Sequence, residues 1–418
     1  MPHLVLLLAL LAFGHFIVDT IASTLNPLWP HMDSAVGMSE GQFLIFGYLC
    51  WTMANSFTQV LFAYLGDRTR SRWVIWIGPM ISILCLSSIG WIENPWLMCL
   101  VLFLAGLGIA AFHPEAAVTA GSMLPGNRSR AMAIFALCGY LGQAVGPYYA
   151  GRLVTDGNMT MLALNLAWAL PAMLVVGLCV SRTLPAIGSS TASPLNLAEI
   201  FRGRRGVMFQ LVAGGVLRII PALGIPLSLA YLLNPDRYTP GDIGLVQSVF
   251  MAGIGGGAIF CAVFARPAWE KLMLWLPALL AAPAVLFIGT VPYNGKIVLC
   301  FTAGCLLGIA MPVFISYAQQ LLPRGQRVAT SLTMGFSWGI ASILVAITIR
   351  GFQHLEMLDQ VFWFFAAACI ACSLLCYLLP RLAAPEDTEA GSAFPYQGPD
   401  LHADADPDDT RKGSPPVD

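Results

Sequence analysis

Long apolar runs recur along the first 380 residues and are separated by short polar stretches. A helix of roughly 20 apolar residues crosses about 30 Å of hydrocarbon, and twelve runs reach this length. The pattern therefore predicts an all-α membrane protein with twelve transmembrane helices. The expected helices lie near residues 4–24, 42–64, 73–91, 96–118, 132–154, 159–181, 207–232, 241–264, 272–291, 295–318, 328–349 and 359–379.

Composition supports this interpretation. Of the 418 residues, 57% are hydrophobic and 10% are charged, with a mean hydropathy of +0.74, which lies outside the range of soluble domains. The first run could alternatively be a signal peptide, but it lacks a basic start and continues through Asp19. The net charge of -1 conceals an acidic tail after residue 380, rich in Pro and Asp, that is predicted to be disordered.

Basic residues predict the orientation. If both termini are cytoplasmic, fourteen Lys and Arg side chains fall in or beside the inner loops, and four fall outside. Such a positive-inside bias is typical of inner-membrane proteins, and an odd number of spans would scramble it. The four outer basic residues are Arg152, Arg237, Lys296 and Arg350.

An internal repeat divides the chain. The run FLAGLGIAAFHP from Phe103 matches FTAGCLLGIAMP from Phe301 with small gaps, and downstream landmarks keep an offset close to 200 residues. Two six-helix bundles related by pseudo-two-fold symmetry are therefore expected. The predicted parts are an N-terminal bundle (1–182), a cytoplasmic linker (183–206), a C-terminal bundle (207–380) and a disordered acidic tail (381–418).

Five ionisable side chains lie in the interior of predicted helices, away from the ends: His15, Asp19, His113, Glu115 and Arg218. A charged group at the centre of a membrane helix costs about 2.5–3.5 kcal/mol on insertion scales, so partners or a water-filled passage are expected. His15 and Asp19 are four residues apart and share one helix face. His113 and Glu115 are two apart and point to nearly opposite sides of a regular helix, unless Pro114 bends it.

Depth along the helices separates the two acids. Counting from the helix ends places Glu115 in the cytoplasmic third of the membrane and Asp19 toward the outer half. The acids are therefore expected to be two stations for a proton. The alternative is that these polar groups only fix helix packing.

Two motifs resemble signatures of the major facilitator superfamily. The inner loop FAYLGDRTRSRW resembles Gly-x-Leu-Ala-Asp-Arg-x-Gly-Arg-Arg through Leu65, Gly66, Asp67, Arg68 and Arg72, and departs from it at Ala63, Arg70 and Ser71. The fifth-helix segment CGYLGQAVGPYYAG is similar to the antiporter motif of that superfamily through Gly142, Gly146, Pro147 and Gly151. The resemblance implies a gating role for Asp67, Arg68 and Arg72, and export by antiport.

Within the superfamily, GHFIVDT, AFHPEAA and VLRIIP look like the fosmidomycin resistance group of drug exporters. The resemblance implies that the first, fourth, seventh and tenth helices line a central cavity, which places all five ionisable residues there. We expect Glu115 to be the main coupling acid, Asp19 an accessory, His113 a hydrogen-bond tuner, and Arg218 a counter-charge or a ligand for an anionic substrate.

The sequence thus predicts a monomeric proton-coupled exporter of a small organic compound, without a cofactor and without nucleic-acid partners. No GxxxxGK[ST], HExxH or large catalytic loop indicates an enzyme. Cys369, Cys372 and Cys376 share a helix face, and packing is favoured over a metal site for them. The alternatives are a metal-ion or organic-anion transporter of the same fold, with His15, Asp19, His113 and Glu115 as metal ligands, or a receptor or membrane enzyme that transports nothing.

Overall fold

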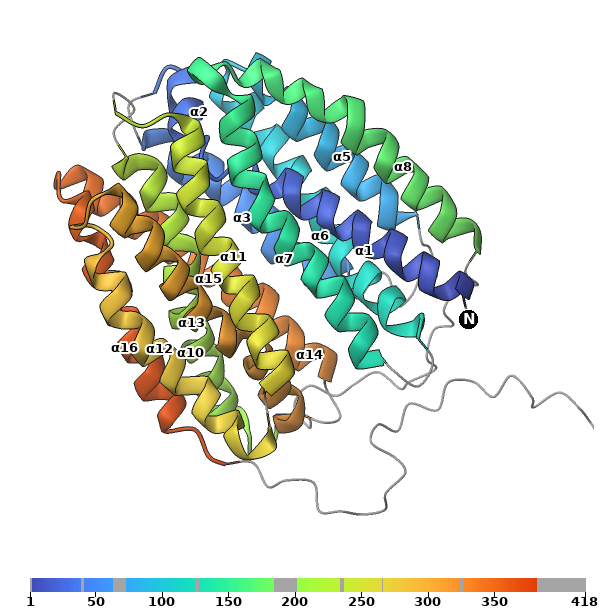
Figure 1. Ribbon diagram of the computed structural model, residues 1–418, viewed down its shortest axis with the longest axis vertical. Coiled ribbons are helices and arrows are strands. Elements are labelled where there is room, and N and C mark those ends of the chain that lie inside the picture. The colour runs from blue at the N-terminus through green and yellow to red at the C-terminus, as the bar shows by residue number, and fades with distance from the viewer. Residues whose placement is uncertain are drawn as a thin grey trace, which may run out of the picture. The chain divides into compact units, whose positions relative to one another are not determined.

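A computed structural model describes residues 2–38, 41–62, 73–124, 128–183, 201–233, 237–264, 266–322 and 326–381. Every regular element within these ranges is a helix (Figure 1). The α-helices are α1 (Pro2–Ser23), α2 (Trp29–Ala35), α3 (Leu49–Ser56), α5 (Val74–Ser88), α6 (Pro95–Ser122), α7 (Arg128–Leu153), α8 (Asn165–Thr183), α10 (Arg205–Leu232), α11 (Pro240–Phe264), α12 (Glu270–Phe287), α13 (Tyr293–Leu321), α14 (Gln326–Ser331), α15 (Ser337–His354) and α16 (Val361–Tyr377). The 3₁₀ and π segments are η1 (Leu44–Tyr48), η2 (Ile89–Trp91), η3 (Thr155–Gly157), η4 (Met159–Leu164), η5 (Pro267–Trp269), η7 (Leu332–Phe336) and η8 (Leu358–Gln360).

Eleven helical stretches in the described ranges are long and apolar enough to cross a membrane. They match eleven of the twelve predicted runs. The remaining run, 42–64, begins as the π-helix η1, continues as α3 to Ser56 and is interrupted at Phe57, and its description ends at residue 62. The break at Phe57 leaves no single long helix within the described part of this run. A twelve-helix fold accommodates all of these elements.

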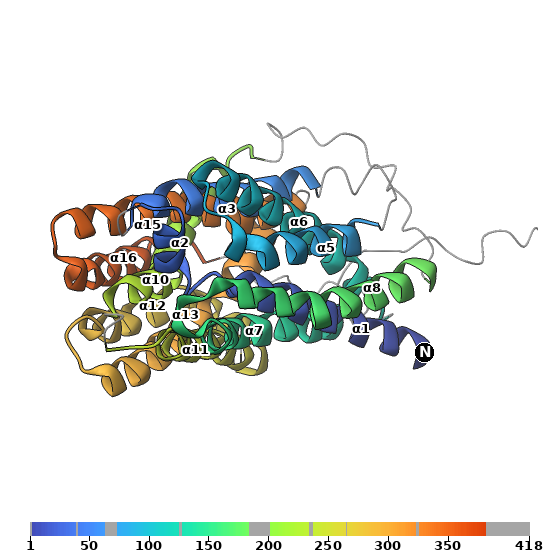
Figure 2. The same cartoon turned by 90° about the horizontal axis from the view of Figure 1, so that it is seen from above.

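The two halves of the chain repeat the same helix pairs. In the first half α1 packs on α7, α5 on α6 and α3 on α6; in the second half α10 packs on α15, α12 on α13 and α11 on α13. Figures 1 and 2 show α1, α5, α6 and α8 on one side, and α10, α12, α13 and α16 on the other. The predicted repeat therefore corresponds to two helix bundles of similar design.

The long helices that join these bundles include the pairs α7 with α11 and α3 with α15. The pairs exchange under the repeat, as a pseudo-two-fold axis requires. Residues 184–200, most of the predicted linker, and the predicted tail from residue 382 lie outside the described residues, so the domain boundaries remain predictions.

Candidate functional site

The α1 face that carries His15 and Asp19 is covered by α7. A Cβ atom on Gly139 would collide with the His15 imidazole, and Cβ atoms on Gly142 or Gly146 would collide with the backbone of α1. Because small residues let membrane helices approach closely, these glycines bring α7 within hydrogen-bond reach of the acid. The local sequence thus sets the spacing of the site.

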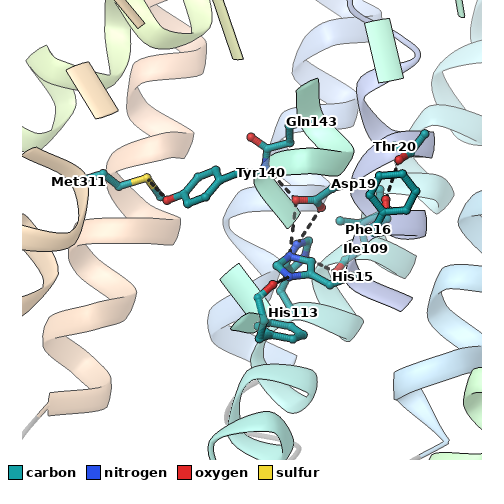
Figure 3. A network of polar contacts seen from close by, with 10 residues as sticks. His15, Phe16, Asp19, Thr20, Ile109, His113, Tyr140, Gln143 and Met311 are labelled. Atoms are coloured by element: carbon teal, nitrogen blue, oxygen red, sulfur yellow. Dashed lines mark hydrogen bonds and ion pairs between the residues drawn. The ribbon is translucent and has the colours of Figure 1, made fainter. Parts of the chain in front are cut away.

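The Asp19 carboxylate is the centre of a buried polar group that we call the Asp19 cluster: His15, Asp19, His113 and Gln143 (Figure 3). His113 Nε2 lies 3.2 Å from Asp19 Oδ1. His15 Nε2 lies 3.5 Å from Asp19 Oδ2, and Gln143 Nε2 donates to the same oxygen at 2.9 Å. The expected shared face of His15 and Asp19 is therefore present, and α6 and α7 complete the group.

Both imidazoles of the cluster have a defined hydrogen on Nδ1. His15 Nδ1 lies 2.8 Å from the carbonyl oxygen of Phe135, and His113 Nδ1 lies 3.0 Å from that of Ile109. A carbonyl only accepts, so each Nδ1 donates. A neutral imidazole then presents a bare Nε2 lone pair to the carboxylate. Without a further proton, acceptors would face acceptors, so the geometry favours a cluster that holds one.

Glu115 is not part of this cluster. It is half-buried on α6, and its oxygens are not among the carboxylate, imidazole and thiol ligand atoms that gather within 4.8 Å around Asp19. Helix α6 continues through Pro114, so residues two positions apart point in different directions. His113 faces Asp19, so Glu115 projects from a different side of α6. The structure pairs His113 with Asp19, although depth counting had separated Asp19 from this part of α6.

Arg218 lies in the second bundle, on α10, and is only 4% exposed. Its Nε has no hydrogen-bond partner, and its guanidinium forms no ion pair with an acid in the described part of the chain. The guanidinium carbon lies 5.5 Å from the centre of the Phe314 ring. A buried, unpaired cation is therefore separate from the Asp19 cluster.

Tyr140 on α7 was not singled out from the sequence. Its hydroxyl donates to the Met311 thioether of α13 at 2.9 Å, which links the two bundles (Figure 3). Met311 lies one turn before Phe314 on α13, so Tyr140 approaches the ring that Arg218 faces. An aromatic residue beside a glycine gives no functional signal in sequence, so only the fold reveals this position.

The antiporter-type motif contacts both bundles. Gly142 and Gly146 face α1, whereas the backbone of Pro147 meets Gly244 of α11 and that of Pro240 meets Gly151. The Tyr148 amide also donates to Ser248 Oγ at 2.9 Å. The motif therefore couples the helix that holds Asp19 to the second bundle. Asp67, Arg68 and Arg72 of the predicted gating loop lie outside the described residues.

A second buried acid, Asp33 of α2, was missed because it lies in a polar loop. It accepts hydrogen bonds from the amides of Gly41 and Phe43, at 2.9 and 2.8 Å, and from the Tyr231 hydroxyl of α10 at 2.8 Å. Burial raises the pKa of Asp33, and these donors partly offset the rise. We call this group the Asp33 clamp, because it ties the first loop to the second bundle.

His15, Asp19 and His113 offer one ligand atom each, and these atoms lie within 4.8 Å of one another, close enough for a shared metal ion. Glu115, a fourth ligand in the metal alternative, does not join them. The cysteines behave differently. Cys369, Cys372 and Cys376 are buried and free, and no histidine or acid joins them in a described group of metal-binding geometry.

Buried polar groups inside two matched bundles of apolar helices are the arrangement expected of a membrane transporter. Residues 11–346 match the family model of the Major Facilitator Superfamily. The chain belongs to this superfamily, as its loop and fifth-helix motifs predicted, and it is a transporter and not an enzyme. The predicted fold class is confirmed by the same match.

Individual relatives are distant. The chain is 22% identical over 348 residues to the fosmidomycin resistance protein of Escherichia coli (strain K12), covering 82% of this chain and 85% of the relative. It is also 22% identical over 351 residues to the uncharacterized MFS-type transporter YfnC of Bacillus subtilis (strain 168), covering 81% and 84%.

Solved structures share the fold. A bacterial homolog to the human lysosomal transporter Spinster, in an inward-facing and unoccupied conformation, aligns with a TM-score of 0.70 at 14% identity, covering 91% of this chain and 97% of the other. A mutant of the nucleoside transporter NupG aligns with a TM-score of 0.70 at 14% identity, covering 88% and 98%.

Proposed function

We propose that this protein is a proton-coupled antiporter that exports a small organic compound by alternating access. The Asp19 cluster carries the proposal: two imidazoles that donate through Nδ1 direct their Nε2 atoms at one buried carboxylate. Such a group binds a proton strongly in one arrangement and releases it when its partners separate. We further propose a monomer in the inner membrane with both termini cytoplasmic.

Asp19 is the main coupling acid in this mechanism. A proton shared between Asp19 and His113 converts the opposed acceptors into a hydrogen-bonded pair. When the proton leaves, the neutral amide of Gln143 is the remaining donor to the Asp19 carboxylate. The Nε2 lone pairs of His15 and His113 then repel the carboxylate oxygens. The released state then favours a different arrangement of α1, α6 and α7. Glu115 becomes the accessory acid, which reverses the ranking expected from sequence.

Arg218 has the other role in the proposed cycle. Among the described residues it is buried without an ion pair, and its Nε has no acceptor, whereas the other buried cation of the second bundle, Lys296, donates to two carbonyl oxygens; Arg218 therefore serves as counter-charge or as substrate ligand. The Pro147–Gly151 contact with α11 moves with the cluster, and Asp67, Arg68 and Arg72 are proposed to secure the inner loop. Export is supported by the antiporter-type motif and by the resistance phenotype in the name of the Escherichia coli relative.

A metal ion is the rival cargo, since three ligand atoms lie within 4.8 Å. The test therefore has two arms. Purified protein in liposomes with an internal pH dye is given fosmidomycin and a panel of organic compounds in one arm, and radioactive Zn²⁺ in the other. We expect organic cargo to move protons in the wild type, and Zn²⁺ to move none.

Variants identify the coupling groups. We expect Asp19→Asn and His113→Gln to lower pH-driven transport at least a hundredfold, and Glu115→Gln to lower it less. Glu93→Gln, which changes an exposed acid, is the matched control. Proton binding is measured without cargo by infrared spectroscopy. We expect a carboxyl band that changes with pH in the wild type and is missing in Asp19→Asn. Full pH-driven transport in both Asp19→Asn and His113→Gln, or an unchanged infrared band, would refute the assignment.

A further inference from the structure

The guanidinium of Arg218 is a charged group without a described partner. It is 4% exposed, no acid pairs with it in the ranges that the structure covers, and its Nε is buried without an acceptor. A buried charge is normally paired, because an isolated one is strongly unfavourable. The missing partner is therefore expected to be a ligand that carries a negative charge.

The groups around Arg218 are flat, apolar and polarisable. The guanidinium carbon of Arg218 lies 5.5 Å from the centre of the Phe314 ring. This ring packs beside Gly214 and Gly215 of α10, and a side chain at either glycine would contact it. Met311 precedes Phe314 by one turn on the same face of α13. The Cys376 thiol also lies beside Gly214, because a Cβ atom on this glycine would meet Cys376 Sγ. One cation therefore lies among aromatic and sulfur-containing side chains.

Tyr140 supplies one hydroxyl donor to this group. Its hydrogen bond to the Met311 thioether uses a weak acceptor, so exchange for a carboxylate oxygen would strengthen it. Met311 precedes Pro312 in the repeat, as His113 precedes Pro114 in the first half. The same place in the two bundles thus holds a proton-binding imidazole on one side and an apolar thioether on the other.

We propose that Arg218, Tyr140, Met311 and Phe314 bind a small aromatic monocarboxylate, and we call these four residues the Arg218 site. The proposal rests on the transport function proposed above and names the class of its cargo. The planar guanidinium pairs with the carboxylate, while Phe314 and Met311 contact the ring.

A single negative charge fits better than two. The other buried cation of the described chain, Lys296, already donates to the carbonyl oxygens of Ile288 and Gly289, at 2.6 and 3.2 Å. Arg218 therefore provides the one buried positive charge of the described residues whose donors are not taken up by carbonyl oxygens, and the proton held by the Asp19 cluster offsets the negative charge of Asp19. A dianion such as a phosphonate would retain an uncompensated charge in a buried place.

Direct binding tests the class of cargo at constant pH. Detergent-purified protein is incubated with tritiated benzoate, and unlabelled benzoate, methyl benzoate, cyclohexanecarboxylate and phenylphosphonate compete for it. We expect benzoate to bind at least tenfold more tightly than each of the other three. The ester tests the charge, the cyclohexane acid tests the ring, and the phosphonate tests the single charge.

Variants locate the binding. We expect Arg218→Gln to weaken the binding of benzoate at least tenfold. Arg218→Lys should weaken it less, because an ammonium keeps the positive charge but lacks the two parallel N–H donors of the guanidinium. Phe314→Leu should abolish the preference for benzoate over cyclohexanecarboxylate while the protein stays monodisperse. Arg205→Gln, at an exposed position of the same helix, is the matched control and should bind benzoate like the wild type.

Two results would overturn the proposal: methyl benzoate or phenylphosphonate competing as well as benzoate, or undiminished benzoate binding in both Arg218→Gln and Phe314→Leu. Absence of benzoate binding to a wild type that transports another compound with protons would also overturn it, and would leave the proposed antiport intact. Benzoate binding by a protein that moves no protons would instead refute the antiport alone. The two proposals therefore fail separately.

Discussion

Gln143 acts on Asp19 through one hydrogen bond, and it does so from a helix more than 120 residues away. Its amide donates at 2.9 Å to the oxygen that also faces His15. Such a bond favours the ionised carboxylate, because an N–H donor binds a negatively charged oxygen more strongly than an oxygen of the neutral acid. Gln143 is therefore placed to set the pH at which the cluster releases its proton, without being a proton carrier.

Replacing Gln143 by Leu is expected to move the pH profile of transport. Loss of a hydrogen bond to a charged group is worth about 1.5–3 kcal/mol, so proton release should require a pH higher by on the order of one unit. The measurement is the pH of half-maximal transport in liposomes. Gln320→Leu removes an exposed amide from α13 and serves as control. An unchanged pH profile with a lower maximal rate would assign Gln143 a packing role instead.

At the scale of helices, α7 is the element that joins chemistry to movement. Gly139, Gly142 and Gly146 fit it to α1, and Gly151 fits it to the start of α11 in the other bundle. A shift of α7 relative to either neighbour therefore changes both the contacts of Gln143 with Asp19 and the interface between the bundles. The glycines of the antiporter-type motif thus have a physical role: they let α7 pack closely on a neighbour in each bundle.

Gly151→Ala tests the interface side of α7. The added Cβ would meet the backbone of Pro240, so we expect at least a tenfold loss of transport with the Asp19 cluster unchanged. Gly351→Ala is the matched control, since nothing lies within 4 Å of a Cβ there, and it should leave transport intact and slightly raise thermal stability. Transport at the wild-type rate in Gly151→Ala would show that this contact is not part of the cycle.

The positions of the helices were predictable from the sequence, whereas the contacts between distant helices were not. Apolar length located eleven of the spans closely, because the bilayer imposes a minimum length on each. The π-helical segment η1 (Leu44–Tyr48) was not predictable, since π-helical segments depend on tertiary packing. His15 and Asp19 pair within one helix, so their spacing showed it. The contact of Asp19 with His113 and the role of Tyr140 depend on how distant helices meet.

At the scale of the whole molecule, polar contacts close the end of the bundles at which α2 lies. The Asp33 clamp joins the first loop to α10, and Gln247 of α11 donates to the backbone oxygen of Asn26 at 3.1 Å. A Cβ on Gly41, whose φ is +76°, would collide with Gln353 of the second bundle. Alternating access requires these contacts to break when this end opens, so their strength sets the population of the two states.

Tyr231→Phe is expected to favour opening of this end. Removing the hydroxyl deletes one hydrogen bond to the Asp33 carboxylate, worth about 1.5 kcal/mol or more, and should raise the ratio of open to closed molecules about tenfold. Spin labels on cysteines at Ser34 and Leu355, in a variant without native cysteines, report the distance across the end. Tyr238→Phe is the control, because that ring stacks on Tyr293 within the second bundle. Identical distance distributions in Tyr231→Phe and the wild type would show that the clamp supports the loop alone, whereas a longer distance in Tyr231→Phe and not in Tyr238→Phe would identify Asp33 as a determinant of which side is open.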